Sequence, residues 1–411
     1  MTAALSGCMS ADGSSGNVTL KLIAADYDVN GGHSSRDYWA NVVGEFEAAH
    51  PGIKVDVTIE TWTDIDRKVA EMVEAGKAPD IAQTGGYAAY AAEEKLYSAD
   101  QMLSIPVQSN FLAPLISAGE QQRTQYGLPF VASTRLLFYN KKLFAEAGIE
   151  KAPKTWDQLR DAAEKLKDST DVTYPFALPL GPEEAQIETM MWLLSNDSNG
   201  YVDPGGSYAI DSKENTDAIT WVKSNLVERG LTGPTAPGKL DRKQAFVAFT
   251  EGKVGMLNGH PSLMKEAEAA GVEVGKVPMP GRLGTPKTSV GVADWIMGFK
   301  QNGHRTEIGK FFNFLFADKH VLAFASQNNM LPPTVTASEA MEADARHKSL
   351  KGFLEALPSA QLPPVNKNSW SAVSSEIKLK IGSAVAPGNS PGKVLEGIAK
   401  KATEAETTEE E

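Results

Sequence analysis

A regular alternation of strand-like and helix-like segments near the start of the chain constrains the fold most. Residues 18–23 and 55–59 alternate apolar and polar side chains and are rich in β-formers. Between them, residues 39–46 carry large apolar side chains at helical spacing, and a second such stretch covers residues 63–73. A short third strand begins at residues 79–81. This order predicts a parallel sheet covered by helices.

The same kind of pattern restarts after residue 127. A strand at 136–140 leads into a short helix that Gly148 ends. A capping box formed by Thr155 and Gln158 opens the next helix. Further strand and helix patterns are expected at 215–228, 241–249, 254–257, 305–317, 319–327, 371–386 and 391–403. The fold class is therefore α/β.

Length and charge limit the classes of function. A chain of 411 residues exceeds what one core usually organises, so we expect two domains. The net charge of −12 disfavours nucleic acid as a partner, because phosphate binding needs a basic surface. A single cysteine cannot form a disulfide or a cysteine zinc site within the chain. No apolar run reaches the roughly 18 residues of a membrane-spanning helix.

That one cysteine, Cys8, ends the tetrapeptide Leu5-Ser6-Gly7-Cys8, which resembles a bacterial lipobox. A buried core thiol is the alternative, but residues 10–17 are polar, glycine-rich and too poor in apolar side chains to pack. We therefore expect a lipid on Cys8, with residues 1–17 as a signal remnant and flexible leash. The basic and apolar parts of a signal peptide are not among residues 1–7, so we expect a start annotated late or a trimmed chain.

Seven segments together resemble extracellular solute-binding proteins of bacterial ABC importers, of the carbohydrate-binding, maltose-binding-protein-like type. They occur in that family's order and span most of residues 18–400. The segments are Phe46-Glu-Ala-Ala-His-Pro-Gly-Ile-Lys-Val55, Gly76-Lys-Ala-Pro-Asp-Ile81, Tyr126-Gly-Leu-Pro-Phe130, Leu137-Phe-Tyr-Asn-Lys-Lys-Leu-Phe144, Pro153-Lys-Thr-Trp-Asp-Gln-Leu159, Phe249-Thr-Glu-Gly-Lys-Val-Gly-Met256 and Gly309-Lys-Phe-Phe-Asn-Phe-Leu315.

The resemblance implies a periplasmic-binding-protein-like fold of two α/β lobes, with a ligand cleft between them and hinge crossings of the chain. Lobe one would hold residues 18–130 plus 292–330, and lobe two residues 131–291 plus 331–400. The crossings would fall near 128–135, 288–291 and 330–333. Residues 401–411 read as a solvated, disordered acidic tail.

The resemblance also implies a function. Such a protein would capture a carbohydrate, a mono- or oligosaccharide or polyol, and deliver it to an ABC permease. We expect a monomer that is anchored through Cys8 to the outer face of the cytoplasmic membrane, at the cell surface, with no catalysis and no cofactor. A sugar site needs carboxylates, amides or Arg for its hydroxyls and aromatic rings for its apolar faces.

The first candidate contacts follow the first strand, where family members often touch ligand. Asp26, Tyr27 and Asp28 lie in this loop, although a solvated turn is the alternative. With Asn30, Gly31 and Asp37 the two aspartates also match a calcium-loop spacing, but the final bidentate glutamate is absent. We expect no metal here and keep calcium as an alternative.

Two aromatic residues follow the next strands. Trp62 is either a sugar platform or a hydrophobic staple ahead of the Thr63 cap. Tyr87 follows two glycines, which allow close backbone approach, and would face the cleft.

Polar candidates come from the first crossing and from lobe two. Arg135, close to Ser133, sits beside an apolar run and needs either an internal carboxylate or a ligand as partner, and we favour a ligand. Glu183 and Gln186 open a helix, where negative charge is also ordinary. His260 stands where many relatives carry an aromatic ring, and it could equally be structural.

The last candidates lie at the return crossing and further on. Asp294 and Trp295 would pair a hydrogen-bond acceptor with a stacking ring. Trp370 opens a helix where relatives stack a sugar, against a plain core tryptophan as alternative.

A secreted glycoside hydrolase is the rival class. It would need two carboxylates roughly 5–10 Å apart, and the many acidic residues do not exclude such a pair. No zinc-protease motif or P-loop occurs in the sequence, and we expect no nucleophile elbow. A scaffold or adhesion protein, the third class, would not need a polar and aromatic cleft. The resemblance therefore favours a receptor.

Overall fold

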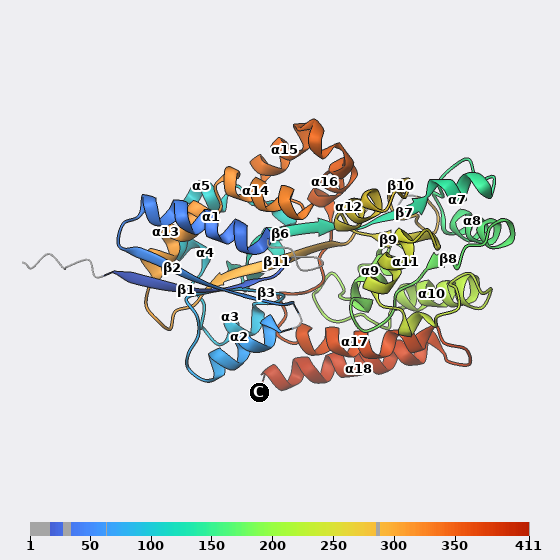
Figure 1. The fold of residues 1–411 in the computed structure, drawn as a ribbon. Coiled ribbons are helices and arrows are strands. Elements are labelled where there is room, and N and C mark those ends of the chain that lie inside the picture. Colours follow the sequence, from blue (N-terminus) through green and yellow to red (C-terminus); the bar gives the residue numbers. More distant parts are fainter. Residues whose placement is uncertain (1–16, 28–33, 63, 285–287, 411) are drawn as a thin grey trace, which may run out of the picture.

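The computed structural model describes residues 17–27, 34–62, 64–284 and 288–410. They form two α/β lobes that lie side by side, each built around its own β-sheet (Figure 1). This confirms the predicted fold class and the two-lobe architecture.

The sheet of lobe one has the strand order β2-β1-β3-β11-β6. β1 runs parallel to both β2 and β3, as the alternating pattern predicted, whereas β11 is antiparallel to β3 and β6. The carboxyl ends of β1, β2 and β3 therefore share one edge of the sheet. The strands are β1 (Val18–Ala25), β2 (Ile53–Glu60), β3 (Ile81–Thr84), β6 (Leu128–Thr134) and β11 (Gly291–Gly298).

Helices cover both faces of this sheet (Figure 1). They bury large aromatic side chains such as Trp39, Phe46 and Phe311. The helices are α1 (Ser34–Ala49), α2 (Ile65–Glu74), α3 (Ala88–Ala92), α4 (Ala99–Met102), α5 (Ile105–Gln108), α6 (Ala113–Ala118), α13 (Arg305–Leu315), α14 (Asp318–Asn328), α15 (Val335–Ala343) and α16 (Lys351–Ala356). A small hairpin, β4 (Glu120–Gln121) with β5 (Thr124–Gln125), joins α6 to β6.

The sheet of lobe two has the order β10-β7-β9-β8, and its core contains Trp156, Trp192 and Phe176. The strands are β7 (Leu136–Asn140), β8 (Tyr174–Ala177), β9 (Val254–Gly259) and β10 (Val274–Val277). The helices are α7 (Lys141–Glu146), α8 (Trp156–Ser169), α9 (Ala185–Leu194), α10 (Lys213–Val222), α11 (Arg242–Thr250), α12 (Ser262–Ala269), α17 (Trp370–Ala384) and α18 (Pro391–Glu410). As expected, the Thr155 hydroxyl caps α8 by accepting a hydrogen bond from Gln158 N.

Two of the expected lobe boundaries are wrong. β6 pairs with β11 as far as Thr134, so the first lobe extends beyond residue 130. Residues 331–343, expected in lobe two, contact lobe one: Leu331 and Ala132 exchange backbone hydrogen bonds of 2.9 Å, and Asn110 Nδ2 donates to Thr336 Oγ1. Burial of α15 against lobe one decides this placement, and a helical pattern cannot show which lobe a helix covers. α16 contacts both lobes: Thr134 Oγ1 donates to Phe353 O, and the Phe353 ring lies 5.9 Å from that of Phe138 in β7.

The third crossing consequently lies near Gln361 rather than near residues 330–333. Gly291 N donates to Gln361 O at 3.0 Å, and Gln361 N donates to Ser289 O at 2.9 Å. The Ser289 hydroxyl donates to Arg135 O at 2.9 Å. The three crossings are thus hydrogen-bonded to one another, which is the arrangement that a hinge between two lobes requires.

The expected disordered acidic tail is also wrong. α18 continues as a helix to Glu410 and packs along α17 (Figure 1). Ala402 is fully buried, and Glu406 forms an ion pair with Lys367. Glu404 is exposed, while Leu395, Ile398 and Ala402 pack into the core of lobe two, so the helix buries an apolar face despite its acidic residues.

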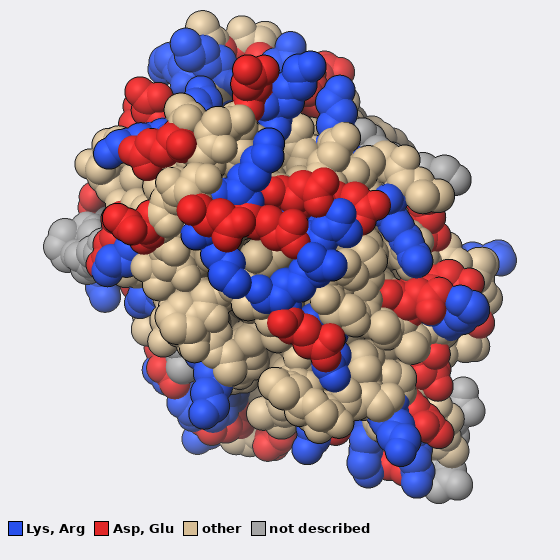
Figure 2. All heavy atoms as spheres, turned by 90° about the vertical axis from the view of Figure 1, so that its right-hand side faces the viewer, with Lys and Arg blue, Asp and Glu red and all other residues tan. Residues whose placement is uncertain are grey.

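Charges of both signs are interspersed over the far end of lobe two (Figure 2). This face shows no continuous basic surface of the kind that binds nucleic acid. Among the described residues, none of the helices combines the length and the apolar composition that crossing a bilayer requires.

Candidate ligand-binding cleft

A cleft of about 660 Å³ lies between the lobes, which is within the usual size of small-molecule sites. We call it the interlobe cleft. Lobe one lines it with α2 and with the loop after β3, and β11 contributes residues 292–294. Lobe two lines it with the start of α9 and with one face of α17. The carboxyl ends of parallel strands thus open onto the cleft, where ligands of open α/β sheets usually bind.

Five predicted contacts line the interlobe cleft: Trp62, Tyr87, Gln186, Asp294 and Trp370. Trp62 from lobe one and Trp370 from lobe two are both half-buried, so each presents part of its ring there. Gln186 and Asp294 also line the cleft. The buried Oε1 of Gln186 has no hydrogen-bond partner among the described residues. Two aromatic rings from opposite lobes, with polar groups between them, match what a carbohydrate needs.

A chain of hydrogen bonds holds Asp294 from the lobe-one side. Ala25 N donates to Gln83 Oε1 at 3.1 Å, and Gln83 Nε2 donates to Tyr27 Oη at 2.5 Å. The Tyr27 hydroxyl in turn donates to Asp294 Oδ2 at 2.6 Å. The Tyr27 ring packs edge-on against Trp62, with ring centroids 5.5 Å apart. Tyr27 therefore supports two cleft residues at once.

Burial shifts the pKa of both partners. It raises the pKa of Asp294 to about 6, even though the Tyr27 hydrogen bond acts in the opposite direction, and the nearby Asp66 and Glu184 raise it further. Burial and the Asp294 charge raise the pKa of Tyr27 well above its ordinary value. Tyr27 thus remains a hydrogen-bond donor at neutral pH.

Tyr87 lines the cleft as predicted, whereas the structure contradicts the predicted role of Trp295. Tyr87 borders the cleft, but its side chain is 1% exposed and its hydroxyl donates to Ala118 O. Trp295 is fully buried, and its ring packs against Tyr87 at 5.3 Å. Successive residues of a strand point to opposite faces, so Asp294 faces the cleft while Trp295 enters the core of lobe one.

Arg135 has an internal partner, so the preference for a ligand is wrong. Its guanidinium donates to Glu184 and, at 2.9 Å, to Ser133 Oγ, and it is 2% exposed. Arg242 donates to the second oxygen of Glu184 at 2.9 Å and to the fully buried Glu188 at 2.8 Å. Two arginines and two glutamates thus form a buried, charge-balanced network below the cleft.

This network places Glu184, and not Glu183, at the cleft. Glu183 is exposed and accepts a hydrogen bond from Lys243 N at 2.9 Å, away from the cleft lining. Burial opposes ionisation of Glu184, but Arg135 and Arg242 outweigh it and lower its pKa to about 2. Glu184 is therefore a permanently ionised acceptor at the start of α9.

His260 lies beside the buried network and outside the cleft lining. Its ring packs on Phe246 at 4.8 Å, and its Nδ1 is 2.9 Å from Ser262 Oγ. Burial, reinforced by the charge of Arg135, lowers the pKa of His260 to about 3. These contacts favour a structural role for His260 over contact with a ligand.

Other predicted residues are only partly described. Asp26 is half-buried and its backbone N donates to Glu60 O, whereas Asp28, Asn30 and Gly31 lie outside the described residues. Asp37 is exposed in the first turn of α1. In the described ranges, no three or more His, Cys, Asp or Glu side chains are placed to hold a metal ion. Cys8 also lies outside the described residues.

Sequence reasoning missed several cleft residues. Asp66, in the first turn of α2, accepts a hydrogen bond from Gly85 N at 2.9 Å, and burial raises its pKa. α17 turns one face of small and basic side chains to the cleft: Ser371, Ser374, Ser375 and Lys378. Their spacing of three and four residues was visible, but only tertiary contacts show that this polar face borders a cleft.

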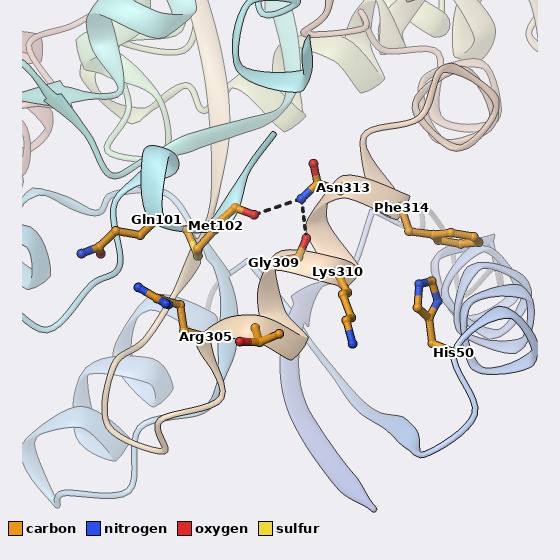
Figure 3. A pocket seen from close by; sticks show the side chains of 9 residues that line it. His50, Gln101, Met102, Arg305, Gly309, Lys310, Asn313 and Phe314 are labelled. Carbon is orange, nitrogen blue, oxygen red and sulfur yellow. Dashed lines mark hydrogen bonds between the residues drawn. The ribbon is translucent and has the colours of Figure 1, made fainter. Parts of the chain in front are cut away.

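A second hollow, of about 590 Å³, lies on lobe one against α13 and contains none of the predicted contacts (Figure 3). Its side chains include His50, Gln101, Arg305 and Lys310. The Asn313 amide at its edge donates to Met102 O and Gly309 O, so this polar group holds the fold together. The hollow is open and belongs to one lobe only, which disfavours it as the ligand site.

One pentapeptide matches the nucleophile-elbow pattern G-x-S-x-G, at residues 388–392. It forms the turn between α17 and α18, and Ser390 is exposed there. A nucleophile elbow requires a strand before the serine and a helix after it. This match therefore lacks the structural context of a hydrolase.

Comparison with known proteins agrees with the two-lobed architecture. The sequence profile of bacterial extracellular solute-binding proteins matches residues 32–321. The chain belongs to this family. Its members are binding proteins rather than enzymes.

Two relatives of known sequence match different shares of the chain. A protein of Brucella abortus (strain 2308), named as a binding protein without a stated ligand, is 26% identical over 93% of this chain and 92% of its own length. The sn-glycerol-3-phosphate-binding periplasmic protein of Brucella melitensis is 26% identical over 53% of this chain and 51% of its own.

A solved structure shows the same fold. The cyclic alpha-maltosyl-1,6-maltose binding protein from Arthrobacter globiformis superposes with a TM-score of 0.79 at 18% identity, over 96% of this chain and 100% of that one.

Proposed function

We propose that this family member is the substrate-binding lipoprotein of an ABC importer. It captures a carbohydrate between its lobes and delivers it to the permease in the membrane. The observation that carries the proposal is that Trp62 and Trp370, from opposite lobes, line one cleft together with Asp294 and Gln186. A sugar between two rings would contact both lobes, so binding would favour their closed arrangement.

The similar proteins support this ligand class by their names. One binds a cyclic maltosyl sugar and another binds a phosphorylated polyol. The ligand's charge therefore differs between relatives. Lipidation at Cys8 would hold the receptor on the outer face of the cytoplasmic membrane, and a mass increase at Cys8 in cells that express the full upstream reading frame would test it.

A glycoside hydrolase remains the second candidate, because two cleft carboxylates have pKa values displaced in opposite directions. Asp294, with a pKa of about 6, would suit the general acid of a glycosidase. Glu184, with a pKa of about 2, would suit its ionised carboxylate. Both Glu184 oxygens, however, already accept hydrogen bonds from arginines, which weakens a nucleophile or base. We therefore favour binding without turnover.

Incubation with mono- and disaccharides tests the two functions, with and without calcium. A raised melting temperature with unchanged sugar supports a receptor. A hydrolysed sugar, detected by chromatography, supports the enzyme instead. If none of the sugars raises the melting temperature, carbohydrate binding is overturned.

A further inference from the structure

Asp294 and Glu184, which line the interlobe cleft from opposite lobes, have oxygens that can accept further hydrogen bonds. The direction of the Tyr27–Asp294 hydrogen bond follows from its neighbours. Ala25 N can only donate, so it fixes the Gln83 carbonyl oxygen, and Gln83 must then present its NH₂ to Tyr27 Oη. The Tyr27 oxygen accepts this bond, and the single hydroxyl proton of Tyr27 is donated to Asp294 Oδ2.

This direction leaves Asp294 with one open oxygen. Within the described residues, no hydrogen bond reaches Oδ1, while Asp294 lines the cleft. Across the cleft, each Glu184 oxygen accepts one arginine N–H and retains a second lone pair. The partnerless Oε1 of Gln186 adds a buried acceptor on the same wall as Glu184. A ligand that satisfies Asp294 and Glu184 must donate hydrogen bonds.

The basic groups around the cleft are largely committed. Arg135 and Arg242 neutralise Glu184 and Glu188. Lys367 donates to Gly206 O at 2.9 Å and pairs with Glu406, and Lys95 pairs with Glu93. Lys378 on α17 interacts with the charge of Asp66 on the opposite wall. No arginine is among the described residues that line the cleft, and Lys378 is the one lysine there that forms no ion pair with a described residue.

Two helix N-termini at the cleft already hold negative charge. Asp66 occupies the first turn of α2, and Glu184 is the residue that precedes α9. Helix N-termini favour anions, and here the protein's own carboxylates take those positions. A ligand phosphate at either of these two N-termini would meet a carboxylate, whereas α17, which begins at the cleft with Trp370, has no acidic residue in its first turn.

We propose that the interlobe cleft selects an uncharged or cationic polyhydroxylated ligand, whose hydroxyl or ammonium groups bridge Asp294 and Glu184, and that it rejects phosphorylated sugars. This inference rests on the proposed carbohydrate-binding function. It separates this chain from its glycerol-phosphate-binding relative by the charge of the ligand rather than by its size.

Isothermal titration with paired probes tests the inference. Glucose, maltose, glycerol and glucosamine would be compared with glucose 6-phosphate, maltose 1-phosphate and sn-glycerol 3-phosphate at pH 7.5. We expect at least one unphosphorylated probe to bind, and its phosphorylated counterpart to bind at least about tenfold more weakly, because like charges repel strongly in a partly buried cleft. Equal or tighter binding of a phosphorylated probe overturns the inference but leaves carbohydrate binding intact. Failure of every probe overturns the proposed function together with the inference.

Variants locate the source of the selectivity. Asp294→Asn should weaken the neutral probe and shrink the discrimination against its phosphorylated form by at least about threefold. Asp66→Asn serves as a second variant that reduces the discrimination, in case the first folds poorly by circular dichroism. Glu71→Gln is the matched control, since it removes one negative charge from the exposed side of α2, where Glu71 pairs with Arg67. An equal effect of Glu71→Gln would show that overall charge, and not the cleft, sets the selectivity, and would overturn the inference.

Discussion

The Tyr27 hydroxyl donates a 2.6 Å hydrogen bond to Asp294 Oδ2, and the two residues are 267 positions apart in the chain. The bond joins the loop after β1 to β11, which leaves the second crossing. It therefore couples one wall of the interlobe cleft to the hinge. Its removal should change ligand binding more than folding.

Tyr27→Phe should weaken binding of a neutral sugar at pH 7.5 by about fivefold, which corresponds to roughly 1 kcal/mol for one lost hydrogen bond. The Asp294 carboxylate would lose its donor, so the pKa of Asp294 should rise further. Titration calorimetry would measure the affinity. Tyr38→Phe is the control, because the Tyr38 hydroxyl donates only to His320 O, at 3.3 Å and away from the cleft. Equal losses in both variants would contradict a specific role for Tyr27.

Affinity for a neutral sugar should fall as the pH drops through about 6. A sugar hydroxyl donates to ionised Asp294, so binding favours the carboxylate and is complete well above its pKa of about 6. At pH 5 only about a tenth of Asp294 is ionised, so affinity should fall by up to about tenfold. Tyr27, Asp66, Arg135 and Glu184 are the charged and titratable groups that act on Asp294.

Asp294→Asn should remove this pH dependence between pH 5 and pH 7.5. Glu184 and His260, with pKa values of about 2 and about 3, do not titrate in this range. Affinity measured at four pH values for both proteins would check the prediction. A pH profile that persists unchanged in the variant would assign the dependence to another group.

Glu184→Gln should destabilise the fold by about 3 kcal/mol. The change leaves the buried Arg135 and Arg242 with one carboxylate, Glu188, between them, and an uncompensated buried charge is costly. Urea unfolding would measure the free energy. Glu183→Gln, at the neighbouring exposed position, is the matched control and should change stability by less than about 0.5 kcal/mol. A similar effect of the two substitutions would argue against the network.

Alanine substitutions of Trp370 and Trp295 should have different effects, one on ligand affinity and the other on the stability of the fold. Trp370→Ala should weaken sugar binding by at least about 1 kcal/mol, since aromatic anchors dominate such sites and its ring lines the cleft. Trp295→Ala should instead lower the free energy of unfolding by about 3–5 kcal/mol, because it leaves a large cavity in the core of lobe one. Urea unfolding and titration calorimetry on both variants would compare the two effects. Wild-type affinity in Trp370→Ala would show that this ring is not a ligand platform.

Local sequence patterns predicted much of the fold. The alternation from Val18 to Ile81 predicted the parallel strands β1, β2 and β3 of lobe one. Thr155 caps the first turn of α8, as expected. These features depend on contacts within a few residues, which periodicity records directly. The lobe assignment of residues 331–343 failed because an amphipathic helix can cover either lobe, and only the surface that it covers differs.

The candidate site was predictable to a smaller degree. Trp62, Gln186, Asp294 and Trp370 were correctly placed at the cleft because they follow strand ends or open helices there. Trp295 was misplaced, since a large ring beside a cleft residue can turn into either the cleft or the core. Tyr87 was correctly placed at the cleft, but its hydroxyl bonds to Ala118 O. Asp66 and Lys378 were missed because their own sequence neighbourhoods are those of ordinary helix surfaces.

The sequence by itself determined the α/β class, the family and the general chemistry of a polar and aromatic cleft, because these depend on local pattern and residue type. The tertiary structure alone decided which groups are free to meet a ligand. Arg135 is committed to Glu184, and Asp294 is oriented by Tyr27, through contacts between residues 49 and 267 positions apart. Hydrogen-bond partners at such separations are set by how the strands and helices of each lobe pack together. The charge balance of the cleft follows from those partners.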